Sequence, residues 1–388
     1  MSLTSILRRA SRVTALASAI VVTLTAGVVK ESVAQEIVIG VVVPVTGVLA
    51  AYGTPYAEAA KIAVDEANAK GGVNGRQLKL VVEDSQASNT VAINAVNKVL
   101  QLNPVAIIGP GLGTQIMALM PTVEKEKVPL IAGPGTRRVT QQGWKYFFRS
   151  AAHDAIDKET WTRFLVEDLN KKKIGIMHVA NEWGFSGRDN TTMFLEKLYN
   201  LKPVSVAAYQ TTDKDLTAQI LQMKRDGAEA IVVQGHPVDE ALAMRQLRQL
   251  DIQATVIGSG TTCVAFLRNL VVPADIVGRY CQAPALMPSY SDSAKVKEFV
   301  AEYKKRLGIL PDSYVMLTYD TTAMLIEVMK KYGVDREKIR QGLSEMPYTG
   351  ITGTFKADAE HNLWHSAVVM EFQPENKVKV VRRHEVKP

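Results

Sequence analysis

The sequence predicts an α/β protein made of two doubly wound lobes. Apolar runs of strand length alternate with helix-length amphipathic segments from residue 36 to about residue 258, and this order is typical of parallel sheets that are covered by helices on both faces. The alternation restarts near His153, which indicates a second unit of the same kind. The chain after residue 34 is also too long for one hydrophobic core, because cores stop growing at roughly 250–300 residues.

The first βαβ unit spans residues 36–85. It opens with an uninterrupted apolar run at 37–43, as expected for a strand that is buried on both faces. A turn leads into a helix whose small residues recur at helical spacing, and Gly71-Gly72 ends that helix. Residues 76–83 form the second strand, and the handedness rule predicts a right-handed crossover between the two strands.

This unit also carries a spaced set of residues, namely Pro44-x-Thr46-Gly47, Ala51-Tyr52-Gly53, Ala63, Asn68-Ala69-x-Gly71-Gly72-Val73-x-Gly75-Arg76 and Glu83-Asp84. The set resembles the N-terminal region of the periplasmic leucine/isoleucine/valine-binding proteins, which are the solute receptors of ABC importers. The resemblance continues at matching spacing to the C-terminus. It implies the type I periplasmic-binding-protein fold, in which a three-strand hinge joins two Rossmann-like lobes.

The alternating pattern places the remaining elements in order. It predicts helices over residues 89–102, 115–125, 158–170, 187–199, 215–225 and 238–250. It predicts strands over residues 105–108, 129–132, 144–149, 173–179, 204–209, 230–234 and 255–258. The pattern then changes to helices over 292–307, 312–332 and 336–343, followed by short strands at 353–355, 367–372 and 377–381.

The resemblance also implies the domain boundaries. In that family the chain crosses between the lobes three times, here expected near residues 152, 283 and 360. One lobe would then contain residues 35–152 and 283–360, and the other would contain residues 153–282 and 361–388. Lobes joined in this way close on a ligand that is held between them.

Residues 1–34 have the pattern of a secretory signal peptide. Three arginines precede an apolar stretch at 13–29, and the small residues Ser32-Val33-Ala34 precede the expected cleavage site. A membrane anchor is the alternative, but the stretch is short and diluted by Thr and Ser, whereas a span usually needs ~20 strongly apolar residues. We therefore expect a cleaved signal and a periplasmic location.

The charge and the cysteines exclude several classes of function. Of 46 basic and 39 acidic residues, 42 and 38 lie outside residues 1–34, without a concentrated basic face, so we expect no nucleic-acid partner. Cys263 and Cys281 could pair in an oxidising compartment, although two separate buried thiols fit the sequence equally well. No metal-ligand spacing is present in the sequence, and we expect neither a metal nor a cofactor.

Ligands of open α/β sheets bind beyond the carboxyl ends of the strands, so the turns after the strands are the expected site. The resemblance implies that small hydroxyl residues and backbone N–H groups hold a ligand carboxylate. Matching turn to turn places this role on Gly113, Thr114, Pro134, Gly135 and Thr136. The aromatic positions of the site fall on Tyr52, Trp183 and His236.

The resembling proteins hold the ligand ammonium with an acid in the turn after Ile257, where this sequence has Ser259-Gly260-Thr261. A buried ammonium without a partner is costly, so the sequence favours an aromatic acid without an α-amine, bound near Gly260. A branched-chain or other amino acid is the alternative, in which Glu182 could turn inward. We expect Asp239 and Glu240 on the outer start of a helix, where acids are favoured.

Three classes of function remain open. We expect a monomeric receptor that delivers a small carboxylate to an inner-membrane ABC permease. A secreted sensor that regulates a partner would have the same sequence features. An enzyme is the third class, because Gly109-x-Gly111-x-Gly113 follows a strand and opens a helix. The third glycine of the dinucleotide motif is displaced in that loop, and the loop follows the third strand rather than the first, so we expect no catalytic activity.

Overall fold

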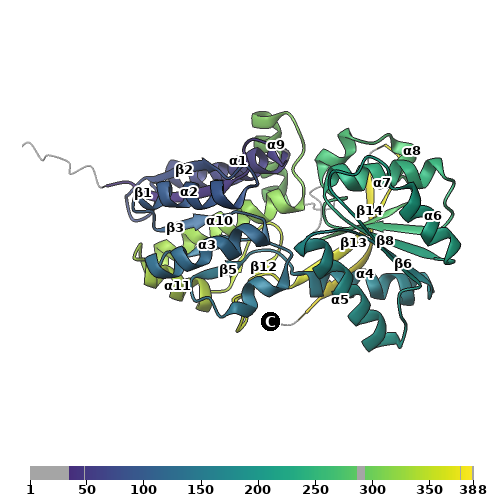
Figure 1. Ribbon diagram of the computed structural model, residues 1–388. Coiled ribbons are helices and arrows are strands. Elements are labelled where there is room, and N and C mark those ends of the chain that lie inside the picture. The colour runs from purple at the N-terminus through teal and green to yellow at the C-terminus, as the bar shows by residue number, and fades with distance from the viewer. Residues whose placement is uncertain (1–34, 48, 286–292, 376, 387–388) are drawn as a thin grey trace, which may run out of the picture. The chain divides into compact units, whose positions relative to one another are not determined.

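The computed structural model describes residues 35–47, 49–285, 293–375 and 377–386 (Figure 1). The predicted signal peptide, residues 1–34, lies outside the described residues. Within the described ranges, no helix is both long enough and apolar enough to span a membrane. The predicted α/β class is confirmed, because two mainly parallel sheets carry helices on both faces.

The first sheet has five parallel strands in the order β2-β1-β3-β4-β5. The strands are β1 (Ile37–Val43), β2 (Leu78–Asp84), β3 (Ala106–Ile108), β4 (Leu130–Ala132) and β5 (Phe147–Arg149). Every residue of β3, β4 and β5 is buried, because helices cover both faces of the sheet.

Five helices form the two layers on this sheet. One face packs against α1 (Ala50–Ala69), α10 (Ser313–Tyr332) and α11 (Arg336–Glu345). The other face packs against α2 (Asn89–Leu100) and α3 (Gly113–Glu126). A further helix, α9 (Ala294–Leu307), packs through Phe299 and Tyr303 onto α1 and α10. Segments from the two ends of the chain therefore share the core of the first sheet.

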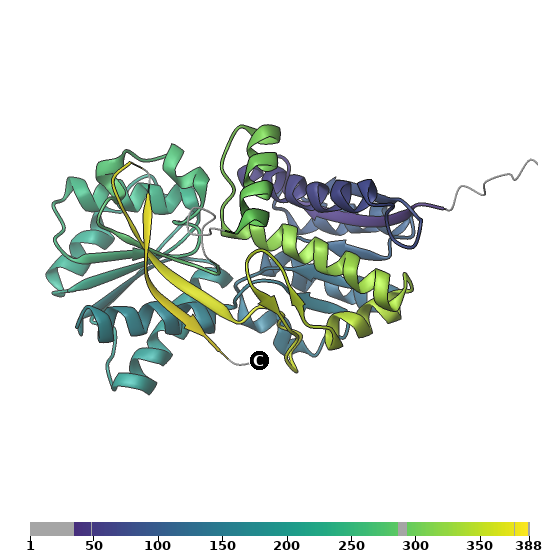
Figure 2. The same ribbon diagram turned by 180° about the vertical axis from the view of Figure 1, so that it is seen from behind.

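The second sheet has seven strands in the order β14-β13-β10-β9-β8-β6-β7. The strands are β6 (Ile174–Val179), β7 (Ser205–Tyr209), β8 (Ala230–Gln234), β9 (Thr255–Gly258), β10 (Tyr280–Ala283), β13 (Ser366–Phe372) and β14 (Val378–Glu385). The strands β13 and β14 pair antiparallel to their neighbours, and Figure 2 shows them in yellow at the edge of this sheet.

The faces of the second sheet are covered in the same manner. One face packs against α4 (Asp154–Arg163), its π-helical continuation η2 (Phe164–Asp168) and α5 (Glu182–Tyr199). The other face packs against α6 (Thr217–Arg225), α7 (Pro237–Gln249), α8 (Pro273–Ile276) and the 3₁₀ turn η3 (Ala265–Asn269). Short connections complete the chain: the 3₁₀ turn η1 (Arg137–Gln142) and the pair β11 (Tyr348–Thr349) and β12 (Thr354–Phe355).

Helix α5 begins five residues before the predicted start. The side chain of Asn181 accepts a hydrogen bond from the N–H of Gly184 at 3.0 Å and caps the helix. Trp183 therefore lies in the first helical turn rather than in a loop. The strand β10 and the elements η3 and α8 were not predicted, because residues 259–283 show neither strand nor helix periodicity over a sufficient length.

Arg149, the last residue of β5, is completely buried. Its guanidinium donates to the carbonyl oxygens of Pro134, Thr136 and Arg137 in the turn after β4. Its Nε donates to Asn362 Oδ1 at 2.9 Å, and Asn362 lies just before β13. One side chain thus joins the turn that follows β4 to the segment that leads into the second sheet.

Cys263 and Cys281 form a disulfide bond that ties the segment after β9 to β10. Of the two alternatives that the sequence left open, the structure therefore shows pairing. Replacing both residues by alanine is expected to lower the free energy of unfolding by about 3 kcal/mol, since the bond closes a loop with a sequence separation of 18. Urea unfolding of the double variant checks this, and the wild type under reducing conditions should behave in the same way. Unchanged stability in both would contradict the prediction.

Candidate functional site

One cavity of about 160 Å³ lies where strands of both sheets end. The turns after β1, β3, β4 and β5 contribute to its wall from the first sheet, and the turns after β8 and β9 contribute from the second. Helices α1, α4, α5 and α10 complete the wall. The volume resembles that of a ~150 Å³ engineered cavity that accommodates benzene, so the cavity has room for a small organic molecule of about that size.

The N-terminus of α3 forms one end of this cavity. Gly113 lines the cavity, and Leu112 at the N-cap makes no side-chain hydrogen bond to the helix. The first N–H groups of a helix lack intrahelical partners and carry partial positive charge. The Thr136 hydroxyl is adjacent, because a Cβ on Gly113 would lie 2.7 Å from its Oγ1, and this hydroxyl does not cap η1. Helix N–H groups and a hydroxyl are therefore available together for a carboxylate.

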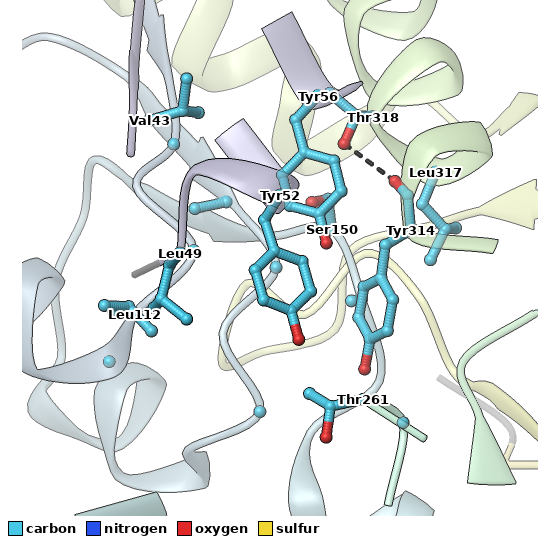
Figure 3. A pocket seen from close by; sticks show the side chains of 18 of the residues that line it. Val43, Leu49, Tyr52, Tyr56, Leu112, Ser150, Thr261, Tyr314, Leu317 and Thr318 are labelled. Atoms are coloured by element: carbon cyan, nitrogen blue, oxygen red, sulfur yellow. Dashed lines mark hydrogen bonds between the residues drawn. The ribbon is translucent and has the colours of Figure 1, made fainter. Parts of the chain in front are cut away.

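Apolar side chains and three tyrosines form the middle of the cavity. The apolar side chains are Val43, Leu49, Leu112, Ile131 and Leu317. Figure 3 shows the hydroxyls of Tyr52 and Tyr314 pointing toward Thr261, which comes from the turn after β9. Burial raises the pKa of both tyrosines well above the ordinary value, so both hydroxyls are neutral. The Tyr52 hydroxyl has no hydrogen-bond partner in the described part of the chain.

Trp183 and His236 form the aromatic wall on the side of the second sheet. Their ring centroids lie 5.2 Å apart at an interplanar angle of 31°. Burial lowers the pKa of His236, although the nearby Asp239 opposes the shift, so the imidazole is neutral near pH 7. Its Nε2 lies 3.2 Å from Asn181 Nδ2, an arrangement in which the amide donates to the ring nitrogen.

Glu240 is fully buried beneath the turn after β9, not exposed on the outer start of a helix. Its Oε1 accepts from the N–H of Gly235 at 3.0 Å and from the Ser259 hydroxyl at 2.6 Å. Its Oε2 accepts from Thr261 at 2.9 Å and from Thr262. The expected outward position of Glu240 is therefore wrong, because four hydrogen-bond donors of the sheet edge draw the carboxylate inward. Asp239 is also buried and accepts from the N–H of His236 at 3.0 Å.

Asp157, on α4, is the acidic residue in the wall of the cavity. Its Oδ1 accepts a hydrogen bond from Gln282 Nε2 at 2.7 Å. Burial raises the pKa of Asp157 to about 8, Asp154 adds to the rise, and Lys158 and Arg149 oppose it. The sequence left open that Glu182 turns into the site. Instead, Glu182 is not part of the cavity wall, and its Oε1 lies 3.8 Å from Arg138 Nη1.

Most of the predicted site residues lie together in the cavity wall, namely Tyr52, Gly113, Gly135, Thr136, Trp183, His236 and Gly260. Pro134 is buried and Thr114 is exposed, and neither is part of the wall. Thr114 lies outside because α3 begins at Gly113 rather than at residue 115, so that Thr114 becomes part of the first helical turn. Contact of any of these residues with a ligand stays a prediction.

Sequence reasoning missed the contribution of α10. Tyr314, Leu317, Thr318 and Thr321 all line the cavity, and their spacing places them on one face of the helix. That stripe of mixed hydroxyl and apolar residues was visible in the sequence, but nothing local connects it with turns that lie far away along the chain. Among the described residues, no group of three or more His, Cys, Asp or Glu side chains could hold a metal ion.

A family model described as periplasmic binding protein matches residues 36–377. A leucine-, isoleucine-, valine-, threonine- and alanine-binding protein of Pseudomonas aeruginosa is 25% identical over 341 residues, which cover 85% of this chain and 88% of the relative. Leu/Ile/Val-binding protein homolog 7 of Brucella abortus is 26% identical over 333 residues, which cover 80% of this chain and 81% of the relative.

Solved structures show the same fold. The branched-chain amino acid transporter substrate-binding protein LivJ of Streptococcus pneumoniae, solved in complex with isoleucine, is 25% identical with a TM-score of 0.81. That similarity covers 91% of this chain and 100% of the other. A leucine-binding protein LivK of Thermotoga maritima has a TM-score of 0.81 at 24% identity, over 90% of this chain and 99% of the other.

Proposed function

Since this chain belongs to the periplasmic binding protein family, in the type that serves ABC transporters, we propose that it captures an α-amino acid and delivers it to an inner-membrane permease. A branched apolar side chain is the favoured class. The observation that carries this proposal is the composition of the single cavity described above. It combines a helix N-terminus and the Thr136 hydroxyl, an apolar middle and one carboxylate, that of Asp157. These are the groups that a zwitterion with an apolar side chain requires.

The amino-acid alternative of the sequence analysis is thus better supported than an aromatic acid. The relatives described above are named for amino acids, and one was solved with isoleucine. The preference for an aromatic acid rested on the lack of an acid in the turn after β9. Asp157 provides an acid from a different element of the same cavity. The proposal involves capture and delivery without a catalytic step.

A thermal-shift screen tests the proposal. The purified protein without residues 1–34 is heated with each of the twenty amino acids, and with benzoate and cinnamate as the aromatic arm. We expect leucine, isoleucine or valine to raise the melting temperature most, because a ligand that binds the native state stabilises it by mass action. Stabilisation by the aromatic acids with none by any amino acid would overturn the proposal.

The proposal includes two lobes that close as a monomer, with the boundaries near residues 152, 283 and 360. Closure follows when the ligand binds the closed form better than the open form. Small-angle scattering should then show a smaller radius of gyration with the ligand than without it, at the mass of one chain. An unchanged radius at saturation would contradict closure.

Replacing Thr136 by alanine is expected to weaken binding of the amino acid by about 1.5–3 kcal/mol. The substitution removes the hydroxyl, so the charged carboxylate of the ligand would lose one hydrogen bond. Thr114→Ala is the matched control, since Thr114 is exposed and lies outside the cavity wall. Titration calorimetry measures both affinities. Equal affinities of the two variants would remove Thr136 from the carboxylate end of the site.

A further inference from the structure

Resting on the proposed function, we propose that Asp157 binds the α-ammonium group of the ligand. The resemblance to the leucine/isoleucine/valine-binding proteins implies an ammonium-binding acid in the turn after β9. This chain has Ser259-Gly260-Thr261 in that turn instead. In this chain the role passes to α4, on another edge of the same cavity. Asp157 would then be the residue that makes this site prefer ligands with an amino group over ligands without one.

The position and the contacts of Asp157 carry the inference. Its side chain lines the cavity and is only 4% exposed. Gln282, at the carboxyl end of the neighbouring strand β10, donates from Nε2 to Oδ1 at 2.7 Å and fixes the carboxylate. This is the one hydrogen bond that reaches the Asp157 carboxylate from the described residues. A carboxylate accepts up to four hydrogen bonds, so it retains capacity for an ammonium group.

The neighbours of Asp157 also have acceptors without donors. Gln282 Oε1 and both carboxylate oxygens of Asp154 are buried and have no hydrogen-bond partner within the described residues. Asp154 lies directly behind the cavity wall, because a Cβ on Gly135 would be 3.0 Å from its Oδ1. Buried acceptors are nearly always paired in native proteins. Apart from the Lys158 ammonium, which lies 3.7 Å from Asp154 Oδ1, the cluster offers more acceptors than donors, and this suits an N–H-rich, cationic ligand better than an anion.

Glu240, a second buried acid close to the cavity, is already occupied by hydrogen bonds from the protein. Glu240 accepts from Gly235, Ser259, Thr261 and Thr262, which exhausts the lone pairs of its carboxylate. Thr261, not Glu240, lines the cavity above it. These contacts leave Glu240 in a positioning role for the turn, and the cavity wall contains no second carboxylate among the described residues.

The ionisable side chains around Asp157 come from three elements, namely α4, β5 and α10. On its own helix, Lys158 Nζ lies 3.7 Å from Asp154 Oδ1 and 4.1 Å from the ring of Trp161, so this cation is directed to Asp154. Arg149 on β5 donates to backbone carbonyls rather than to either carboxylate. Tyr314 on α10 remains neutral. Asp157 thus lines the cavity without an ion-pair partner among the described residues.

Asp157→Asn is the test, since it removes the charge while keeping the size of the side chain. The amino acid with the largest shift in the screen is compared with its deaminated analogue, for example leucine with 4-methylpentanoate. We expect the variant to lose at least about 30-fold in affinity for the amino acid, as when one partner of a buried charge pair is removed. Its affinity for the analogue should be unchanged or higher.

Asp168→Asn is the matched control, because it makes the same charge change in η2, where Asp168 pairs with Arg382 on the surface. It should bind both ligands like the wild type. If the wild type binds the amino acid and Asp157→Asn binds it equally well, the inference is overturned and the proposed function stands. A wild type that binds no amino acid overturns both.

A second measurement needs no variant. Because the pKa of Asp157 is raised to about 8 by burial, the carboxyl group of the free protein is mostly protonated at pH 7. An ammonium group requires the ionised form, so binding should release close to ~1 proton at pH 7 and progressively fewer above pH 8. Calorimetry in two buffers with different ionisation enthalpies counts these protons. Release of no proton at pH 7 would overturn the assignment.

Discussion

Replacing Arg149 by methionine is expected to lower the free energy of unfolding by about 3–5 kcal/mol, because it removes a buried donor that several buried acceptors share. The guanidinium is the shared donor for the carbonyl oxygens of Pro134, Thr136 and Arg137 and for Asn362 Oδ1. Without it, the Pro134 carbonyl oxygen and Asn362 Oδ1 stay buried and unpaired, and each such group costs about 1–3 kcal/mol.

The same change should also weaken ligand binding, because Thr136 and Gly135 lie in the turn that Arg149 holds. Arg149→Lys is expected to rescue little, since a single ammonium cannot reach acceptors that are arranged around a planar fork. Arg163→Met is the control, because its ion pairs with Glu159 and Glu167 are partly exposed and such pairs contribute at most about 1 kcal/mol. Urea unfolding of the three variants measures the difference, and equal losses for Arg149→Met and Arg163→Met would refute this role.

Replacing Glu240 by alanine is expected to cost about 3–5 kcal/mol of stability. The side chain is fully buried, and its loss removes the acceptor of the Gly235 N–H and of the Ser259 and Thr262 hydroxyls. The turn would relax, and Gly260 and Thr261 would move away from Tyr314. Binding should therefore weaken together with stability, and a variant with wild-type unfolding and wild-type affinity would contradict both expectations.

Glu240→Gln separates the charge from the shape of this side chain. Burial raises the pKa of Glu240 to about 7, above its ordinary value of about 4.3. The native state therefore binds this proton more tightly than the unfolded state, and the stability that this gives is present below pH ~4 and lost as the pH rises through 7. The wild type should lose stability relative to Glu240→Gln by on the order of 1.4 kcal/mol per pH unit between pH 5 and 7. Urea unfolding at four pH values between 4 and 8 measures this difference, and parallel pH profiles of the two proteins would be the contrary result.

Local rules predicted the parts of the fold that local forces decide. The strand at residues 37–43 was predicted to the residue, because a strand buried on both faces must be apolar throughout. The start of α5 was missed because Asn181 and Gly184 are turn-forming residues that directly follow a strand. The cap from Asn181 extends the helix back to Glu182.

The site was predicted only where it follows from strand ends. Gly113, Thr136 and Gly260 lie in turns at the sheet edges, and the topology of a parallel sheet brings such turns together. Asp157 and Tyr314 lie inside helices, and only the packing of helices on distant parts of the sheet edge brings them to the cavity. Glu240 was misplaced for a related reason: the preference of acids for a helix start is worth about 1 kcal/mol at most on a surface, less than four inward hydrogen bonds.

The last two strands, β13 and β14, complete the second sheet, while α10 and α11 from the same C-terminal region cover the first. Leu325 of α10 shares a core with residues of β1 and α1, so a chain synthesised from its N-terminus leaves part of one face of the first sheet uncovered until α10 has been made. Contacts between residues so far apart in the sequence form slowly, because loop closure must precede them. Each sheet thus reaches its final packing only after the C-terminal segment that completes it has been made: α10 and α11 for the first sheet, and β13 and β14 for the second.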